Sequence, residues 1–333
     1  MRKVKWGVLG VAKIAVEKVI PAMQRGEDCE ITAIASRDPA KAREAAKTLA
    51  IARAYGSYEE LLADSEIEAI YNPLPNEMHV PWTVKALEAG KHVLCEKPIA
   101  LDANEARLLI EARKRSGRLV AEAFMVRFHP QWRRARELVA LGEIGAPGAI
   151  QTFFSYRLLD PANVRNRPPG GGGLYDIGCY AILTARHIFG AEPVRVVAML
   201  GRDRNFRTDR LVSAIVEFPG GRHLTFSAAT QLSPHQRVTI VGEAGRIEVE
   251  IPFNAPPDRP TKILVDTGED LFGGGARVEE FPVCDQYTLQ GDAFSRAIAG
   301  KAPLEFPIED AVLNMRVIDA LFRSAERGSW ESP

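Results

Sequence analysis

Two short stretches of the chain carry side chains whose types and spacing suit acid–base chemistry. The first is GGGGLYDIGCYAI, residues 170–182, in which four glycines precede an aspartate, Asp176, and a tyrosine, Tyr180. On a helix that begins near Leu174, these two side chains lie one turn apart on the same face. The glycines allow the backbone to pass close to a cofactor or substrate without side-chain collision. A helix-terminal charge and a half-buried core aromatic are the structural alternatives.

The second stretch, HVLCEKPIAL at residues 92–101, places Glu96, Lys97 and Pro98 directly after an apolar strand. Ligands of open α/β sheets bind beyond the carboxyl ends of the strands, so this tripeptide is expected to face a cofactor crevice. A lysine there can lower the pKa of a neighbouring hydroxyl or donate a hydrogen bond to a substrate oxygen. We also predict a cis Lys97–Pro98 bond, which aims the lysine away from the sheet. A surface Glu–Lys pair before a turn is the alternative.

A third stretch, KWGVLGVAKIA at residues 5–15, stands where a dinucleotide fingerprint belongs, between the first strand and the first helix. In G-x-G-x-x-G/A the glycines permit a tight turn and close approach of the backbone to the pyrophosphate. The three positions are Gly10, Ala12 and Ala15, so the middle glycine is an alanine. The helix N-terminus still offers amide donors to phosphates. A purely structural turn is the alternative.

The end of the second strand bears on the choice between NADP and NAD. NAD-preferring sites place an acid there to hold the ribose hydroxyls. This chain has Ser36 and Arg37 at that point, and a hydroxyl with a guanidinium suits a 2′-phosphate. We therefore favour NADP. If Asp38 takes the role of the acid instead, NAD is possible.

In the first third of the chain, short apolar strands alternate with helices. These elements must position the candidate cofactor residues. Ser57 and Glu60 have the spacing of a capping box, and Gly90 and Gly117 suit helix ends. This alternation predicts an α/β, Rossmann-type, doubly wound parallel sheet covered by helices on both faces. We expect strands over residues 4–9, 31–35, 69–71, 92–95 and 119–123, and helices to about residue 25 and over about 39–50, 58–63, 80–89 and 103–116.

Beyond about residue 125 the pattern changes to strands that follow one another, separated by turn signals such as PGG and EAG. We predict a second, α+β domain with a large, mainly antiparallel open sheet. The boundaries are residues 1–123 for the dinucleotide-binding domain and 124–333 for the substrate-binding and oligomerisation domain. The expected strands cover residues 149–156, 194–200, 211–218, 222–229, 237–241, 246–251 and 261–265, and the helices 131–140, 174–190, 286–299 and 308–327.

Four motifs, in order along nearly the whole chain, are similar to those of a known family. They are the Gly10 turn, YNPLPNEMH at 71–79, AGKHVLCEKP at 89–98 and GGGGLYDIGCY at 170–180. Together they resemble the glucose–fructose oxidoreductase/inositol dehydrogenase/rhizopine-catabolism (Gfo/Idh/MocA) family, above all its sugar dehydrogenase and reductase branch. The resemblance implies that Lys97 is the catalytic lysine and that Asp176 and Tyr180 are the D-x-x-x-[HY] pair. Ala12 is the clearest departure from the family pattern.

The resemblance leads to a mechanistic hypothesis. Hydride passes between nicotinamide and a sugar or sugar-like hydroxyl or carbonyl carbon, with the cofactor supplying that chemistry. Tyr180 exchanges the proton with the substrate, Lys97 makes its phenol more acidic, and Asp176 orients the sugar and helps to position Lys97. The alternatives are a reductase of a non-sugar carbonyl or a dihydrodiol dehydrogenase, and a non-catalytic nucleotide-binding sensor or regulator.

Further residues are expected to complete the site. Asn76 and His79 either line the nicotinamide ribose or shape the turn after the strand, and His129 is either a substrate contact or a packed structural histidine. The cofactor-binding candidates are Gly10, Ala12, Lys13, Ile14, Ser36, Arg37, Pro73, Asn76, His79, Glu96 and Lys97. The substrate-binding candidates are Arg127, His129, Arg165 and Arg167.

Composition limits the remaining classes of function. The 43 basic and 43 acidic residues balance, which gives no support for nucleic-acid binding. No apolar run is long enough to be a signal peptide or to span a membrane, and four scattered cysteines suggest reduced thiols in the cytoplasm. Without HExxH or a Cys/His cluster, we expect no metal. One uncovered sheet face and the family resemblance together predict a homodimer or homotetramer.

Overall fold

The computed structural model describes residues 2–333, which divide into two compact units. One contains the chain up to Met125 together with Gln286–Met315, and the other contains Val126–Asp285 together with Arg316–Pro333. Residues 286–315 therefore lie in the first unit and not in the second domain, where the predicted boundary at 123/124 placed them. The reason is a set of contacts between residues that are far apart in the sequence, described below.

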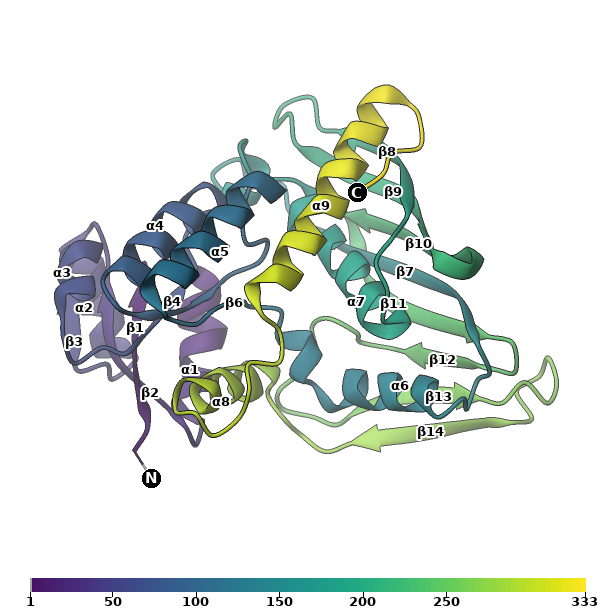
Figure 1. Ribbon diagram of the computed structural model, residues 1–333, viewed down its shortest axis with the longest axis horizontal. Coiled ribbons are helices and arrows are strands. Elements are labelled where there is room, and N and C mark those ends of the chain that lie inside the picture. Colours follow the sequence, from purple (N-terminus) through teal and green to yellow (C-terminus); the bar gives the residue numbers. More distant parts are fainter. Residues whose placement is uncertain (1) are drawn as a thin grey trace. The chain divides into compact units, whose positions relative to one another are not determined.

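The first unit is built on a parallel six-stranded sheet with the order β3-β2-β1-β4-β5-β6 (Figure 1). The order reverses between β1 and β4, as in dinucleotide-binding folds. The predicted Rossmann-type sheet is confirmed, and the structure adds β3, which is too short to carry a pattern of its own. The strands are β1 (Val4–Leu9), β2 (Cys29–Ala35), β3 (Arg53–Tyr55), β4 (Ala69–Asn72), β5 (His92–Cys95) and β6 (Val120–Glu122).

The helices of this unit begin and end largely where local signals place them. Ser57 accepts a hydrogen bond from the Glu60 amide at the start of α3, and Gly117 ends α5 with φ of 65°. One start was wrong: the helix predicted from about Val80 begins at Asn76, directly after Pro75. The helices are η1 (Ala15–Val19, π-helical), α1 (Ile20–Gln24), α2 (Pro39–Thr48), α3 (Tyr58–Ala63), α4 (Asn76–Glu88), α5 (Ala103–Ser116) and α8 (Gln286–Ile298).

Trp6 of β1 accounts for the place of α8. Its ring is fully buried and lies 5.7 Å from the ring of Phe294, and its indole N–H donates a 3.0 Å hydrogen bond to the hydroxyl of Ser295. The hydroxyl of Thr288 donates to the carbonyl of Ala22 at 2.7 Å. These contacts join β1 and α1 to a helix more than 260 positions away in the chain, so α8 completes the core of the first unit.

The second unit contains an eight-stranded sheet with the order β14-β13-β12-β11-β7-β10-β9-β8 (Figure 1). Only β7 and β10 pair in parallel, so the predicted mainly antiparallel sheet is confirmed. The edge strand β14 was not predicted. The strands are β7 (Pro147–Arg157), β8 (Arg195–Arg202), β9 (Asp209–Phe218), β10 (Arg222–Ala229), β11 (Gln231–Gly242), β12 (Arg246–Val249), β13 (Thr261–Asp266) and β14 (Ala276–Phe281).

One face of this sheet packs on helices of its own unit. Along β10, Leu224, Phe226 and Ala228 are buried beneath α7, while His223 and Thr225 are exposed on the other face. The helices and short helical turns of this unit are η2 (Met125–Phe128), α6 (Pro130–Ala140), η3 (Val164–Asn166), η4 (Leu174–Gly178, π-helical), α7 (Cys179–Phe189) and η5 (Pro219–Gly221). Part of α9 (Ile308–Arg327) lies in each unit.

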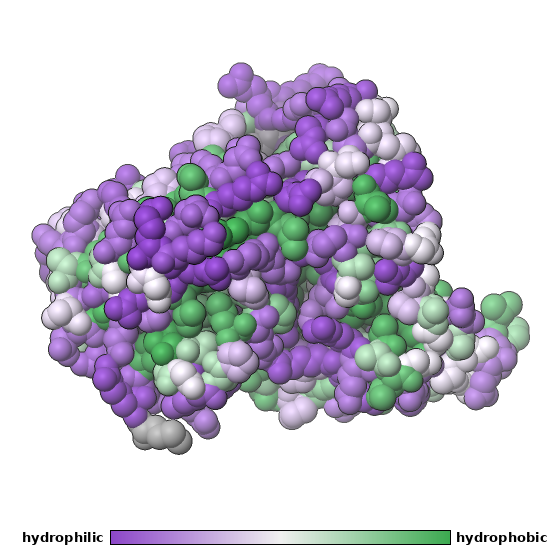
Figure 2. Space-filling view, in the orientation of Figure 1, coloured by the Kyte–Doolittle hydropathy of each residue, from purple (hydrophilic) through white to green (hydrophobic). Residues whose placement is uncertain are grey.

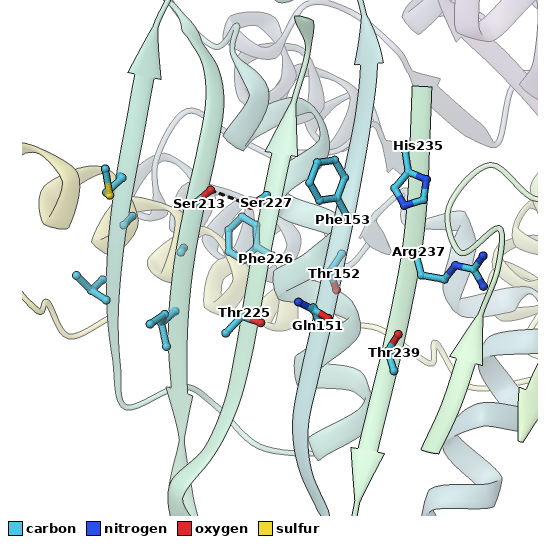
Figure 3. A pocket seen from close by; sticks show the side chains of 15 residues that line it. Gln151, Thr152, Phe153, Ser213, Thr225, Phe226, Ser227, His235, Arg237 and Thr239 are labelled. Atoms are coloured by element: carbon cyan, nitrogen blue, oxygen red, sulfur yellow. Dashed lines mark hydrogen bonds between the residues drawn. The ribbon is translucent and has the colours of Figure 1, made fainter. Parts of the chain in front are cut away.

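The opposite face of the sheet carries a shallow hollow of about 580 Å³. Apolar and small polar side chains mix there, and the hydroxyls of Ser213 and Ser227 lie 2.7 Å apart. The predicted uncovered face is therefore present within the second unit. Figure 3 shows the hollow, whose lining on this face includes Gln151, Phe153, Ser213, Thr225, Ser227, His235, Arg237 and Thr239. Figure 2 shows that hydrophobic residues also reach the surface at the tip of the β13–β14 hairpin.

Candidate functional site

The carboxyl ends of the parallel strands gather most of the predicted cofactor residues at one edge of the first sheet. Gly10 follows β1, Ser36 and Arg37 follow β2, Pro73 follows β4, and Glu96 follows β5. This edge, at the point where the strand order reverses, is where open α/β sheets bind ligands. Lys97 comes directly after Glu96 and belongs to the same edge.

The turn after β1 has the geometry that a dinucleotide needs. Gly10 has φ of +86°, its amide donates to the Ala35 carbonyl at 2.8 Å, and an added Cβ would lie 3.0 Å from the Leu74 side chain. Only glycine fits this conformation and space without strain. The helix begins at once, since the amide of Val16 donates to the carbonyl of Ala12. A tight turn that leads into a helix N-terminus fits a pyrophosphate.

The three polar residues after β2, Ser36, Arg37 and Asp38, have different partners. Asp38 caps α2: its carboxylate accepts hydrogen bonds from the amides of Ala40 at 3.0 Å and Lys41 at 3.3 Å. The amide of Asp38 donates to the hydroxyl of Ser36 at 3.1 Å. Arg37 is exposed. The acid is therefore used to start a helix, while the guanidinium lies in solvent at the edge of the sheet.

The EKP tripeptide is held by the neighbouring strand. The phenol of Tyr71 donates to Glu96 Oε1 at 2.6 Å, and the amide of Lys97 donates to Glu96 Oε2 at 3.3 Å. Burial, followed by the charge of Glu96, raises the pKa of Tyr71 well above its usual value, so the phenol stays a donor. The predicted cis Lys97–Pro98 bond is confirmed.

His79 has a structural environment. Its ring is buried, with Nδ1 2.8 Å from the carbonyl oxygen of Pro98 and Nε2 2.7 Å from that of Leu74. Burial lowers the pKa of His79 to about 4. Since both ring nitrogens meet backbone carbonyls, His79 shapes the turn after β4 and links it to the EKP segment. Asn76 is the first residue of α4 and is partly exposed.

In the second unit, Asp176 and Tyr180 face the same strand, as their spacing predicts. Asp176 accepts a hydrogen bond from the phenol of Tyr156, and the ring of Tyr180 packs edge-on against Phe154 with centroids 6.0 Å apart. Phe154 and Tyr156 are alternate residues of β7 and share one face of the sheet. Tyr180 also lies 5.3 Å from the ring of Phe253. The carboxylate of Asp176 and the ring of Tyr180 thus each contact a side chain of β7.

The glycines before this pair allow close approach within the chain itself. Added Cβ atoms at Gly171 would lie 2.5 Å and 2.6 Å from the carbonyl oxygens of Arg167 and Arg165, and one at Gly172 would overlap the carboxylate of Asp209. We expected these two glycines to let the backbone pass close to a bound molecule. The atoms that leave no room for a side chain belong instead to the chain itself. The two glycines let the loop of residues 165–167 and the start of β9 pack against η4.

Asp176 has a second partner in Arg165. The guanidinium Nε donates to Asp176 Oδ1 at 3.0 Å, while Tyr156 donates to Oδ2. The Asp176 side chain is 12% exposed and that of Arg165 is 43% exposed. Two donors on two oxygens set the orientation of the carboxylate. Such a group can accept a hydrogen bond from a sugar hydroxyl.

The remaining substrate candidates have different environments. His129 caps α6, where its Nδ1 accepts from the amide of Gln131 at 3.2 Å, and burial lowers its pKa to about 4. This environment supports the second alternative, a packed structural histidine. Arg127 is buried, whereas Arg167 is exposed and donates to the carbonyl of Pro161 at 3.2 Å.

Two residues of the second unit, Tyr156 and Asp209, were not among the site residues predicted from the sequence. Tyr156 stands two residues after Phe154 in a strand that alternates, a signal that places its side chain on the helix-covered face. Asp209, which accepts a 2.6 Å hydrogen bond from the amide of Leu174, had no local signal. Both contact the segment that carries Asp176, so both belong to the candidate site.

Comparison with known proteins identifies both parts of the chain. Residues 4–124 match the model of an oxidoreductase family with an NAD-binding Rossmann fold. Residues 132–248 match the model of the GFO/IDH/MocA C-terminal domain. Within the part of the chain that the structure describes, none of the helices is both long and apolar enough to cross a membrane.

Individual relatives cover almost the whole chain. An uncharacterized oxidoreductase of Rhizobium meliloti is 49% identical over 333 residues, which is 100% of both chains. The D-xylose 1-dehydrogenase (NADP+) 2 of Haloferax volcanii is 39% identical over 97% of this chain and 98% of its own. Among solved structures, the 3-ketoreductase KijD10 of Actinomadura kijaniata, in complex with NADP and TDP-benzene, has a TM-score of 0.90 at 27% identity and covers 97% of this chain and 98% of its own.

Proposed function

Because the chain belongs to the Gfo/Idh/MocA family of NAD(P)-binding oxidoreductases, we propose that it transfers hydride between nicotinamide and a sugar or sugar-like substrate. Its named relatives are dehydrogenases and reductases, and the chain is an oxidoreductase that acts on CH–OH or carbonyl groups. The observation that carries the sugar assignment is the Asp176 carboxylate, which accepts a hydrogen bond on each oxygen and suits a hydroxylated substrate.

Three side chains have roles in this proposal. Tyr180 gives a proton to the substrate oxygen in reduction and takes it back in oxidation, Lys97 stabilises the phenolate, and Asp176 orients the sugar and helps to position Lys97. The nicotinamide, when bound, supplies the hydride chemistry. Structures of the related ketoreductase include variants with a lysine replaced by alanine or glutamate and a tyrosine replaced by phenylalanine. A lysine and a tyrosine of that enzyme were thus chosen for mutagenesis. This supports the proposed roles of Lys97 and Tyr180.

NADP is the proposed cofactor. Ser36 and Arg37 stand where the 2′-phosphate of a dinucleotide would lie, and the carboxylate of Asp38 is engaged at the start of α2. A planar guanidinium binds phosphate with paired hydrogen bonds and can stack on adenine. Gly10, Ala12, Lys13 and Ile14 would hold the pyrophosphate. The NADP in the names of two relatives supports the same choice.

The test of this function is a turnover measurement paired with a binding measurement. NADPH binding is followed by fluorescence, and oxidation of NADPH by its near-ultraviolet absorbance, with a panel of aldoses and keto-sugars and with NADP+ in the reverse direction. Binding with turnover of a sugar is expected. Binding without turnover of any carbonyl or alcohol would support a sensor, and turnover of only non-sugar carbonyls or dihydrodiols would overturn the sugar assignment.

The uncovered face of the second sheet is the proposed site of self-association. Val197, Met199 and Ile215 bring apolar surface to this face, and exposed apolar sheet surface marks interfaces. A homodimer or homotetramer follows. We also propose that the protein works in the cytoplasm, which its four free cysteines support.

A further inference from the structure

The hydrogen bond between Tyr156 and Asp176 forms where β7 ends. Tyr156 is the last but one residue of β7, and its phenol donates to Oδ2 of an aspartate on η4. Arg165, from the loop between β7 and η4, donates to Oδ1 at 3.0 Å. The carboxylate is thus held from the sheet on one side and from the loop on the other.

The two donors hold different oxygens of the carboxylate, the phenol of Tyr156 on Oδ2 and the guanidinium of Arg165 on Oδ1. Two directed hydrogen bonds on two oxygens define the orientation of the carboxylate plane. Without the phenol, the side chain could rotate about its own bonds and lose that orientation.

Tyr156 is suited to hold a proton and not to transfer it. Burial raises the pKa of Tyr156, and the negative charge of Asp176 raises it further. The phenol is half-buried and already donates its hydrogen to Oδ2. It therefore stays a neutral donor at neutral pH, and we assign the proton exchanged with the substrate to another group.

We propose that Tyr156 is a positioning residue for the reaction, acting through Asp176. Together with Arg165, it holds the carboxylate in the orientation that receives a substrate hydroxyl. This inference rests on the proposed function, because it assigns Tyr156 a role only in binding and orienting that substrate. No bond to the substrate is made by Tyr156 itself.

The experiment is a double-mutant cycle on kcat/KM with the sugar that the wild-type protein turns over. Tyr156→Phe is expected to lower kcat/KM about 10- to 100-fold, the value of a hydrogen bond to a charged group, with the Kd for NADPH unchanged. In the background of Asp176→Asn, the same substitution is expected to have less than a 3-fold further effect. A merely structural role would give equal losses in both backgrounds.

Tyr55→Phe is the matched control. The phenol of Tyr55 donates to Asp64 Oδ2 at 2.7 Å, and Arg53 pairs with the same carboxylate at 2.8 Å, so this trio repeats the chemistry in the first unit. We expect wild-type kcat/KM for this variant. If Tyr156→Phe does not fold, Arg165→Met is used in the same cycle, because the side chain of Arg165 is partly exposed and its loss does not open the core.

The outcomes separate the two proposals. Turnover by the wild-type protein with an unchanged Tyr156→Phe, or with losses that simply add in the double mutant, would overturn this inference and leave the proposed function standing. Absence of turnover by the wild-type protein with every substrate would overturn both. A loss in Tyr156→Phe that disappears in the Asp176→Asn background would support both.

Discussion

The carboxylate of Asp209 accepts a 2.6 Å hydrogen bond from the backbone amide of Leu174. This contact joins the first residue of β9 to the first residue of η4, the π-helical turn that carries Asp176. Single π-helical turns inside α-helices are frequent at functional sites. The start of the site helix is therefore held by a buried acid from a different part of the chain.

Asp209 predicts an unusual dependence of stability on pH. Burial raises the pKa of Asp209 above its ordinary value of 3.8, because the charged form is poorly solvated. A carboxyl whose pKa is raised on folding contributes its stability below pH 3.8 and loses it as the pH rises through the folded pKa. Asp209→Asn keeps an acceptor for Leu174 but cannot ionise. Its unfolding free energy relative to wild type should therefore rise between pH 4 and pH 7 in denaturant titrations.

Asp203→Asn, in the neighbouring hairpin, is the control. Its unfolding free energy relative to wild type should change with pH in the opposite direction. The amides of Phe206 and Asn205 donate to the Asp203 carboxylate and lower its pKa. Its stabilisation is present above the ordinary pKa, so this variant should lose stability relative to wild type as the pH rises. Equal slopes for the two variants would refute the argument.

Tyr180→Phe tests the proposed proton donor. Removal of a proton-transfer group typically lowers kcat about 10²- to 10⁴-fold, and the ring contacts with Phe154 and Phe253 are kept. The Kd for NADPH should stay within about 2-fold of wild type, since no binding group is removed. Steady-state kinetics and fluorescence titration measure the two quantities. The neighbouring Tyr175→Phe, which keeps its ring contact with Phe322, serves as the control. A wild-type kcat in Tyr180→Phe would show that Tyr180 is not the proton donor.

Arg37→Ala should change the choice of cofactor. Loss of a hydrogen-bonded guanidinium from the 2′-phosphate is expected to raise the KM for NADPH about 10- to 100-fold and to leave the KM for NADH nearly unchanged. Arg43→Ala removes an exposed arginine from α2 and should change neither value. Steady-state kinetics with NADPH and with NADH measure the two KM values. If Arg37→Ala changed both KM values equally, this would argue against NADP selectivity at this position.

Phe294→Ala and Phe272→Ala compare one buried and one exposed aromatic. Phe294 of α8 is 3% exposed and packs on Trp6, whereas Phe272 in the β13–β14 hairpin is 98% exposed. We expect the first substitution to lower the unfolding free energy by about 3–5 kcal/mol and the second to change it by less than about 0.5 kcal/mol. Urea denaturation measures both. Similar losses would mean that α8 does not complete the core of the first unit.

Met199→Asp tests self-association through the uncovered sheet face. Met199 is 78% exposed on β8, and a charge buried without a partner at an interface is strongly unfavourable. Light scattering at micromolar concentration should show a lower mass for Met199→Asp than for wild type. Leu108→Asp introduces the same charge at a 55% exposed position on α5 and should leave the mass unchanged. A wild-type monomer would contradict the proposed oligomer.

Much of the molecule follows from local sequence patterns. Alternating apolar strands and capped helices specify the parallel sheet, and the carboxyl ends of parallel strands necessarily share one edge. Gly10, Ser36, Arg37 and Glu96 could therefore be assigned to one crevice before any coordinates were known. The spacing of Asp176 and Tyr180 likewise placed them on one helix face, because helical periodicity is a local property.

Other features were decided by tertiary structure alone. The partners of Asp176, the acid that holds Leu174, and the place of α8 beside Trp6 all join residues separated by 11 to 289 positions. The contact of His79 with the carbonyl of Pro98, 19 positions away, was likewise decided by the fold. Hydrophobic periodicity and turn residues determine which elements form, whereas side-chain contacts between elements depend on how strands pair and helices pack, which no local pattern encodes.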